Sequence, residues 1–112
     1  LAFSYPLFSN DQLQGVIVAT LNLNWLNQLI ATTELPNGST ISVVDRNGVI
    51  LARYPEPEKW IGTSIEKTDL FKALQTQRTN STTIQKGTDG NLQLFAFSYL
   101  LPQDAPDLRL IV

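Results

Sequence analysis

The residues best suited to chemistry in this sequence lie between Arg53 and Trp60, just after a predicted β-hairpin. Arg53 carries a planar guanidinium group, which can hold a carboxylate through two parallel hydrogen bonds. Tyr54 and Trp60 each combine a broad apolar surface with one polar tip, which suits the wall of a small-molecule pocket. This grouping predicts a ligand-binding site for an anionic small molecule.

Two further aromatic residues, Phe97 and Tyr99, lie on one face of a predicted strand and could form the floor of the same pocket. Each candidate also has a plain structural interpretation. Arg53 could instead pair with Glu56 or Glu58 at the surface. The four aromatic side chains could simply pack in the hydrophobic core.

The composition excludes the common catalytic centres. The 112 residues include no His and no Cys, which removes Ser-His and Cys-His nucleophiles, nearly all zinc sites and haem held by His or Cys. The carboxylates form no pair at a spacing that suggests acid–base catalysis, and no glycine-rich phosphate loop is present. We therefore expect no enzymatic activity, no metal and no cofactor.

Charge and hydropathy limit the possible partners of the protein further. The net charge is −2 and the eight basic residues are scattered, which argues against a nucleic-acid partner. The length is that of one domain, and the apolar runs are far too short to cross a bilayer. Any membrane anchor is therefore expected to lie in segments outside this sequence.

A β-hairpin is expected to position Arg53. Two apolar runs flank Asn47-Gly48, the dipeptide that best fits a two-residue type I′ turn. In that register Val44 lies opposite Leu51, and Ser42 lies opposite Arg53. One face of the hairpin would carry Ile41, Val43, Asp45, Ile50, Ala52 and Tyr54. Both faces have apolar middles, so both should be covered.

The remaining pattern predicts an α+β fold. Further strands are expected at 1–8, 14–23, 82–88, 91–101 and 108–112, and helices at 25–30 and from 68 onward. Asn22 or Asn24 should cap the first helix and Thr68 the second, while 60–65 should form an irregular loop. Tight turns join strands in antiparallel fashion, so we expect a PAS-like five-stranded antiparallel sheet flanked by helices, with an extra N-terminal strand pair.

An internal repeat indicates how the chain is organised. Ala2-Phe3-Ser4-Tyr5 recurs as Ala96-Phe97-Ser98-Tyr99, and each copy opens a strand–loop–strand unit. Two similar modules in tandem would explain the repeat. Residues 1–34 would then be the last strand pair and connecting helix of a preceding module, and residues 35–112 a complete one. The alternative is that 1–34 adds strands to the same sheet.

The ordered motifs resemble the extracytoplasmic Cache sensor domains, the PAS-like modules of bacterial histidine kinases, chemoreceptors and diguanylate cyclases. The resemblance covers nearly the whole chain, and it rests on the segments Phe3-Ser4-Tyr5-Pro6-Leu7, Gly15-Val16-Ile17-Val18-Ala19, Leu21-Asn22-Leu23-Asn24-Trp25-Leu26, Val43 to Arg53 and Trp60-Ile61-Gly62. It implies a periplasmic or extracellular small-molecule sensor anchored to the membrane by flanking segments.

The resemblance also implies where a ligand would bind. Members of the family hold amino acids or carboxylates between the sheet and the segment that follows its second strand, here Pro55 to Ser64. The family's amino-acid signature lies mainly in the first of two modules, before residue 1. The competing hypothesis is a ligand-free interaction module that relays a neighbour's signal and forms a homodimer. Its dimer contact would be the apolar helix face of Trp25, Leu26, Leu29 and Ile30.

Overall fold

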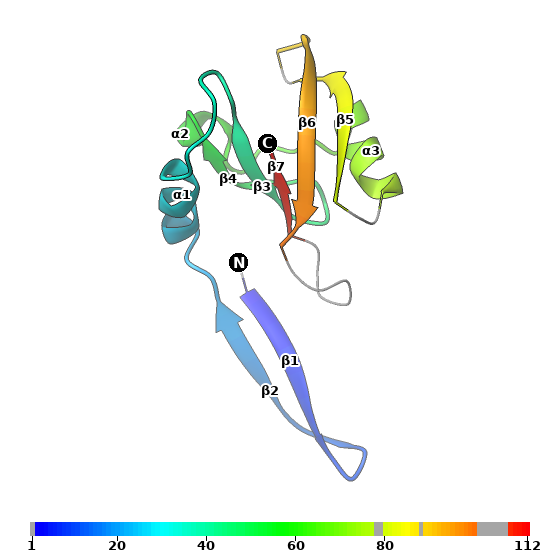
Figure 1. Ribbon diagram of the computed structural model, residues 1–112. Helices are drawn as coiled ribbons and strands as arrows, with labels where there is room; N and C mark the ends of the chain where they lie inside the picture. The colour runs from blue at the N-terminus through cyan, green and yellow to red at the C-terminus, as the bar shows by residue number, and fades with distance from the viewer. Residues whose placement is uncertain (1, 78–79, 88, 101–107) are drawn as a thin grey trace.

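The computed structural model describes residues 2–77, 80–87, 89–100 and 108–112. Its elements, in chain order, are β1 (Ala2–Ser9), β2 (Gln12–Thr20), α1 (Leu23–Ala31), β3 (Ile41–Val44), β4 (Ile50–Tyr54), α2 (Pro57–Trp60), α3 (Asp69–Thr76), β5 (Ser81–Lys86), β6 (Leu92–Tyr99) and β7 (Arg109–Ile111). Figure 1 shows a sheet-and-helix body from which the β1–β2 ribbon projects.

Five strands form one antiparallel sheet in the order β4-β3-β7-β6-β5. The predicted α+β fold with a five-stranded antiparallel sheet is therefore confirmed. The last strand, β7, does not lie at an edge but is inserted between β3 and β6. This order brings β3 beside β7, which is far from it in sequence.

Both faces of the β3–β4 hairpin are covered, as its pattern predicted. Helix α3 packs on one face, where Phe71 and Leu74 join Val44, Phe97 and Ile111 in a buried cluster. Helix α1 packs on the other face, over the half of the sheet formed by β3 and β4. Strand β3 lies between the two helices, and all four of its residues are buried.

The turn of the β3–β4 hairpin differs from the expected type I′ form. Val44 pairs with Ile50 instead of Leu51, because the register shifts next to Val44. Gly48 donates its N–H to the Asp45 carbonyl, and among the turn residues of this hairpin only Gly48 has a positive φ. This is a three-residue loop with a type I turn followed by a bulge at glycine, a form that an Asn-Gly sequence also fits.

The bulge changes which side chains share a face. Ile50 packs with Val44 on the α3 side, whereas the expected two-residue turn would have placed it with Ile41 and Val43. Below the bulge the predicted register is kept, so Ser42 still lies opposite Arg53.

Two helix caps were predicted correctly. The Asn22 side chain accepts the Asn24 and Trp25 amides at the start of α1, and Thr68 Oγ1 accepts the Phe71 amide in α3. The short helix α2 was not predicted, and its last residue, Trp60, was expected to begin an irregular loop. Its first residue, Pro57, suits a helix start, where no amide partner is needed.

The apolar face of helix α1 is only partly buried within the described structure. Leu26 and Ile30 are buried against the sheet. Trp25 and Leu29, which the sequence placed on the same apolar face, are 53% and 50% exposed. The apolar stripe of this helix is therefore wider than the surface that the sheet covers.

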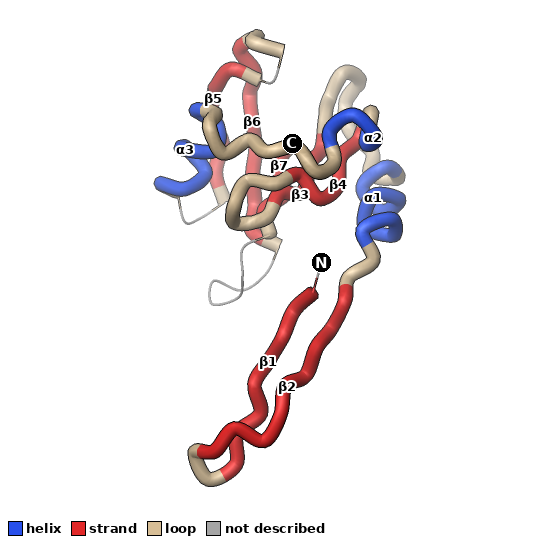
Figure 2. Tube along the Cα trace, turned by 180° about the vertical axis from the view of Figure 1, so that it is seen from behind, coloured by secondary structure: helices blue, strands red, loops and turns tan. Residues whose placement is uncertain are grey.

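Strands β1 and β2 form a sheet of their own that extends away from the five-stranded body (Figure 2). The molecule is consequently elongated, with extents of 55 × 29 × 23 Å. The repeated tetrapeptides take equivalent positions in the two strand pairs. Ser4 lies opposite Val18 in β1–β2, and Ser98 lies opposite Leu110 in β6–β7.

Candidate functional site

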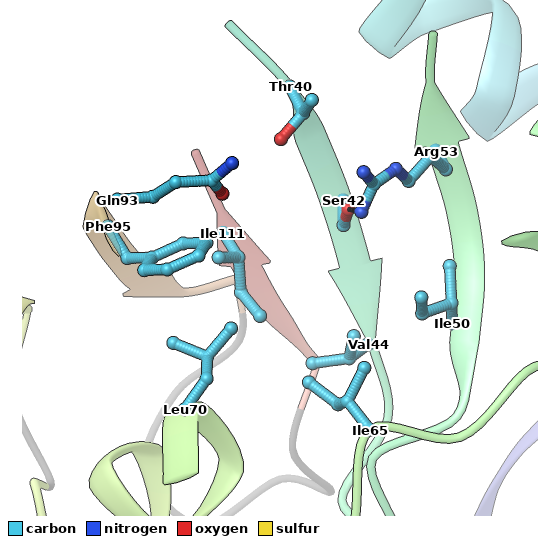
Figure 3. A pocket seen from close by; sticks show the side chains of 10 residues that line it. All are labelled: Thr40, Ser42, Val44, Ile50, Arg53, Ile65, Leu70, Gln93, Phe95 and Ile111. Carbon is cyan, nitrogen blue, oxygen red and sulfur yellow. Dashed lines mark hydrogen bonds between the residues drawn. The ribbon is translucent and has the colours of Figure 1, made fainter. Parts of the chain in front are cut away.

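A small cavity opens on the α3 side of the sheet, at the end where β3 begins (Figure 3). Its volume is about 30 Å³, which is enough for about one or two water molecules. It is lined by Thr40, Ser42, Val44, Ile50, Arg53, Ile65, Leu70, Gln93, Phe95 and Ile111. The lining combines one cation and a few polar groups with an apolar remainder, as is typical of small-molecule sites.

Arg53 supplies the only positive charge in this lining. Its Nη1 donates to Ser42 Oγ at 3.2 Å, across the β3–β4 pair, and Ser42 is itself buried. The Arg53 backbone N–H donates to Asn27 Oδ1 at 3.0 Å, which ties this end of β4 to helix α1. The Arg53 Nε is buried and has no hydrogen-bond partner in the described part of the chain.

The electrostatics of Arg53 follow from its partial burial. Desolvation lowers the pKa of the Arg53 guanidinium, and the negative charge of Glu56 offsets part of this shift. The delocalised guanidinium of an arginine nevertheless stays protonated in proteins, so Arg53 keeps its positive charge. A buried donor without an acceptor is costly, so an anion that accepts from the Arg53 Nε would be favoured.

The indole of Trp60 holds the guanidinium from the side of α2. The Arg53 Cζ lies 4.9 Å from the centre of the Trp60 ring, and Lys59 Nζ lies 5.1 Å from it. Both distances are within the range of cation–π attraction. Glu56 pairs with Lys59 at 3.8 Å, and the described residues show no ion pair between Arg53 and Glu56 or Glu58.

The segment after β4 is fastened to the hairpin, so the cavity has a defined wall. Ile50 N–H donates to the Thr63 carbonyl at 2.9 Å, and Gly62 N–H donates to the Ile50 carbonyl at 2.8 Å. Ile65, which lines the cavity, donates to the Gly48 carbonyl at 2.8 Å. The 62–65 segment therefore covers the outer edge of β4 in the manner of a short extra strand.

The structure brings together only some of the residues expected to form the site. Arg53 lines the cavity, and Trp60 contacts Arg53 from outside the lining. Tyr54 is 45% exposed on the edge strand β4. Phe97 is buried in the core cluster beside the cavity, and neither it nor Tyr54 is part of the lining.

Tyr99 also lies away from the cavity. Its hydroxyl donates to the Gln77 carbonyl at 2.7 Å, and its ring packs 5.2 Å from Arg109 Cζ. Asp45 stabilises the hairpin turn, since its Oδ1 accepts the amides of Asn47 and Val49 at 2.9 Å each.

Sequence reasoning missed three polar residues of the lining, Thr40, Ser42 and Gln93. Ser42 could have been found, because the predicted hairpin register already placed it opposite Arg53. Thr40 and Gln93 could not, because they meet only through the strand order of the sheet. Among the described residues there is no group of His, Cys, Asp and Glu that could hold a metal ion. None of the described helices is long and apolar enough to cross a membrane.

Comparison with known proteins gives matches of structure only. No protein-family model matches the sequence, and no curated protein matches it. The fold is similar to the extracellular domain of rpHK1S-Z16, a protein assigned to the histidine kinases, with a TM-score of 0.72 and 21% identity. It is also similar to the periplasmic sensory domain of the Campylobacter jejuni chemoreceptor Tlp1, with a TM-score of 0.70 and 18% identity.

A third similar structure is the extracellular domain of mmHK1S-Z2, also assigned to the histidine kinases, with a TM-score of 0.70 and 16% identity. These matches cover 98%, 98% and 99% of this chain but only 44%, 41% and 44% of the other chains. The chain thus has the same α+β fold as parts of these three extracytoplasmic domains, and it spans less than half the length of each.

Proposed function

We propose that this chain is part of an extracytoplasmic sensing region of a membrane-bound signalling receptor, and that its cavity binds the carboxylate group of a small molecule. The observation that carries the proposal is the Arg53 Nε, which is buried without a partner among the described residues, at a cavity lined by Ser42, Thr40 and Gln93. The similar structures support the sensing role, because each is a domain outside the cytoplasm of a kinase or chemoreceptor.

The shape of the guanidinium favours a carboxylate over other anions. Nε and the neighbouring Nη of an arginine lie side by side and match the two oxygens of a carboxylate. Ser42 already occupies Nη1, and it can rotate its hydroxyl to donate to the ligand as well. Apolar neighbours such as Phe95 and Ile65 lower the local dielectric and so strengthen the charge-assisted bonds.

The size of the cavity limits which ligands fit into it. A volume of about 30 Å³ admits a carboxylate head but not a whole amino acid. Acetate and similar short acids should therefore need the least rearrangement, a turn of the Arg53 guanidinium that brings its buried Nε to the cavity. A larger carboxylate or an amino acid, the class implied by the family resemblance, requires the cavity to open between Thr40 and Gln93, where it adjoins a larger hollow.

The receptor architecture is part of the proposal. A histidine kinase, diguanylate cyclase or chemoreceptor would place this region outside the membrane and the output domain inside. The β1–β2 pair, which repeats the arrangement of β6–β7, would belong to a preceding module of the same type. In support, the apolar side chains of the ribbon are largely exposed in this chain, for example Phe8 at 65% and Val18 at 62%.

Thermal unfolding in the presence of short carboxylates tests the ligand proposal. Acetate should raise the melting temperature of the wild type, since a ligand at a hundredfold excess over its Kd adds about 2.7 kcal/mol of stability. Arg53→Gln should abolish the rise. Arg46→Gln is the matched control, because Arg46 is exposed in the hairpin turn and should leave the rise unchanged. Chloride at equal ionic strength serves as the blank. A rise that survives Arg53→Gln would refute the site.

The alternative function is a ligand-free module that forms a homodimer and relays a signal from a neighbouring module. It is favoured by the two exposed apolar residues of α1, Trp25 and Leu29, which lie one turn apart. Light scattering after gel filtration tests it. A dimer that Trp25→Ser with Leu29→Ser dissociates, and that Leu92→Ser leaves intact, would support the relay role. A monomer at all concentrations would exclude this interface.

A further inference from the structure

The sequence contains two Asn-Gly pairs, Asn37-Gly38 and Asn47-Gly48, and the structure holds them in very different ways. An Asn-Gly pair is chemically reactive, because glycine has no Cβ that would keep its backbone nitrogen away from the asparagine side chain. In a folded protein the reaction depends on whether that nitrogen can reach the asparagine Cγ. The two pairs therefore allow a comparison of the same dipeptide in two settings of one chain.

The pair Asn37-Gly38 lies in an exposed turn. Ser39 N–H donates to the Pro36 carbonyl at 3.1 Å, and Gly38 has a φ of +83°. Because Asn37 keeps a negative φ, this is a type II turn with glycine at its third position. Both residues of the pair are exposed, and a Cβ on Gly38 would meet no described atom within 4 Å.

Little opposes a rearrangement of this turn. The Gly38 N–H donates to no backbone carbonyl of the described chain. Rotation about the Asn37 backbone, which brings the Gly38 nitrogen to the Asn37 Cγ, breaks only the hydrogen bond from Ser39 to Pro36 among the described backbone hydrogen bonds. A segment with so few contacts opens readily without unfolding of the sheet.

The pair Asn47-Gly48 is held firmly in the hairpin turn. The Gly48 N–H, which must lose its proton before the nitrogen can react, donates to the Asp45 carbonyl at 3.0 Å. The Gly48 carbonyl accepts the Ile65 N–H at 2.8 Å, and the Asn47 N–H donates to Asp45 Oδ1 at 2.9 Å. Gly48 is also buried against Phe71. Reaction at Asn47 therefore requires the hairpin turn to open first.

We propose that Asn37 is a site of spontaneous covalent modification in the folded protein, whereas Asn47 is protected. The Gly38 nitrogen attacks the Asn37 Cγ, and the new C–N bond closes a cyclic imide. The Cγ–Nδ2 bond breaks, and Nδ2 takes up the proton lost by the Gly38 nitrogen and leaves as ammonia. Water then opens the imide at either of its carbonyls and returns a proton to the nitrogen. The products are aspartate and isoaspartate at position 37.

Both products add a carboxylate to the segment that leads to the cavity at Arg53. Thr40, which follows this turn in the chain, lines the cavity (Figure 3). The isoaspartate product also lengthens the main chain by one methylene just before β3. A new negative charge here would oppose the binding of an anion at Arg53. This consequence rests on the proposed function, whereas the modification itself does not.

Incubation of the protein at mildly alkaline pH tests the proposal without any ligand. Peptide mapping by mass spectrometry measures, at each Asn-Gly pair, the fraction in which the side-chain NH₂ has been replaced by OH. In the folded protein Asn37 should convert about tenfold faster than Asn47, because the hydrogen bonds and burial of Gly48 must be given up before Asn47 reacts. In urea, where both pairs are unfolded, the two rates should be similar. Asn37→Gln should remove most of the mass gain of the folded protein.

Two results would overturn the proposal. Equal conversion of Asn37 and Asn47 in the folded protein would show that the hairpin turn gives no protection. A tenfold difference that persists in urea would assign the difference to the neighbouring sequence and not to the fold.

The consequence for the cavity is tested separately with Asn37→Asp, which supplies the carboxylate without the extra methylene. This variant should need a higher acetate concentration than the wild type for the same rise in melting temperature. An equal response of the two proteins would refute the consequence. No response of the wild type would refute the proposed function, and the conversion measured at Asn37 would stand.

Discussion

Replacing Gly48 with alanine should destabilise the protein much more than the same change at Gly90. The two glycines have nearly equal backbone angles, with φ of +79° and +82°, so an L side chain meets a similar penalty at both, roughly 1–2 kcal/mol. They differ in the space around them. A Cβ on Gly48 would lie 3.0 Å from Phe71 Cε2 and 3.1 Å from the Glu66 backbone nitrogen. A Cβ on Gly90 would meet no described atom within 4 Å.

The magnitudes follow from these contacts. Alanine restricts the unfolded chain, which returns about 0.4–1 kcal/mol at either position. Gly90→Ala should therefore lower the free energy of unfolding by about 1 kcal/mol. Gly48→Ala must also displace the Phe71 ring or the backbone of Glu66, and such overpacking costs about 1–3 kcal/mol more. Its total loss should be about 2–4 kcal/mol.

Urea unfolding followed by tryptophan fluorescence measures both losses. The dependence of the unfolding free energy on urea should keep its slope, so that the change in midpoint reports stability alone. Equal losses at Gly48 and Gly90 would refute the reasoning, because they would mean that 66–71 does not pack on the hairpin turn. The wall of the cavity formed by Ile65 depends on that packing.

Three further predictions concern the scaffold. Leu74→Ala should lower the free energy of unfolding by about 2–5 kcal/mol, because Leu74 is fully buried, whereas Leu92→Ala, at a side chain 72% exposed, should change it by less than about 0.5 kcal/mol in the same urea assay. Thr68→Ala should cost about 1 kcal/mol through loss of the α3 cap, and Thr68→Ser should restore most of it by calorimetry. The pKa of Asp89 is lowered, chiefly because its carboxylate accepts the Asn91 backbone N–H. Its stabilising effect is therefore present at neutral pH and lost as the pH falls from the ordinary aspartate range through the lowered value, and Asp89→Asn should remove this part of the acid dependence of the melting temperature.

Most of the fold could be predicted from local signals. The strands follow from alternation and turn residues, and the caps at Asn22 and Thr68 follow from the need to satisfy free helix amides. The bulge beside Val44 could not be predicted, because Asn47-Gly48 fits two turn types and the choice depends on packing. Here the buried Gly48 lies against Phe71, a contact that is distant in sequence.

The site was predictable only where its residues are paired locally. Arg53 stood out by its chemistry, and Ser42 lies opposite it in a single hairpin. Thr40 and Gln93 are far apart in sequence, and they meet only because β7 is inserted between β3 and β6. A strand order of this kind is set by the total burial of apolar surface, which no local motif records.

The most direct test of the central claim is the nitrogen–proton NMR signal of the Arg53 Nε–H group, identified by its loss in Arg53→Lys. This group is buried and lacks a partner in the described structure, so it should shift strongly when a carboxylate binds. Titration with acetate at constant ionic strength should move the signal in a saturable way and leave that of exposed Arg46 in place. A shift of both signals to the same small extent, or of neither, would contradict a carboxylate site at Arg53.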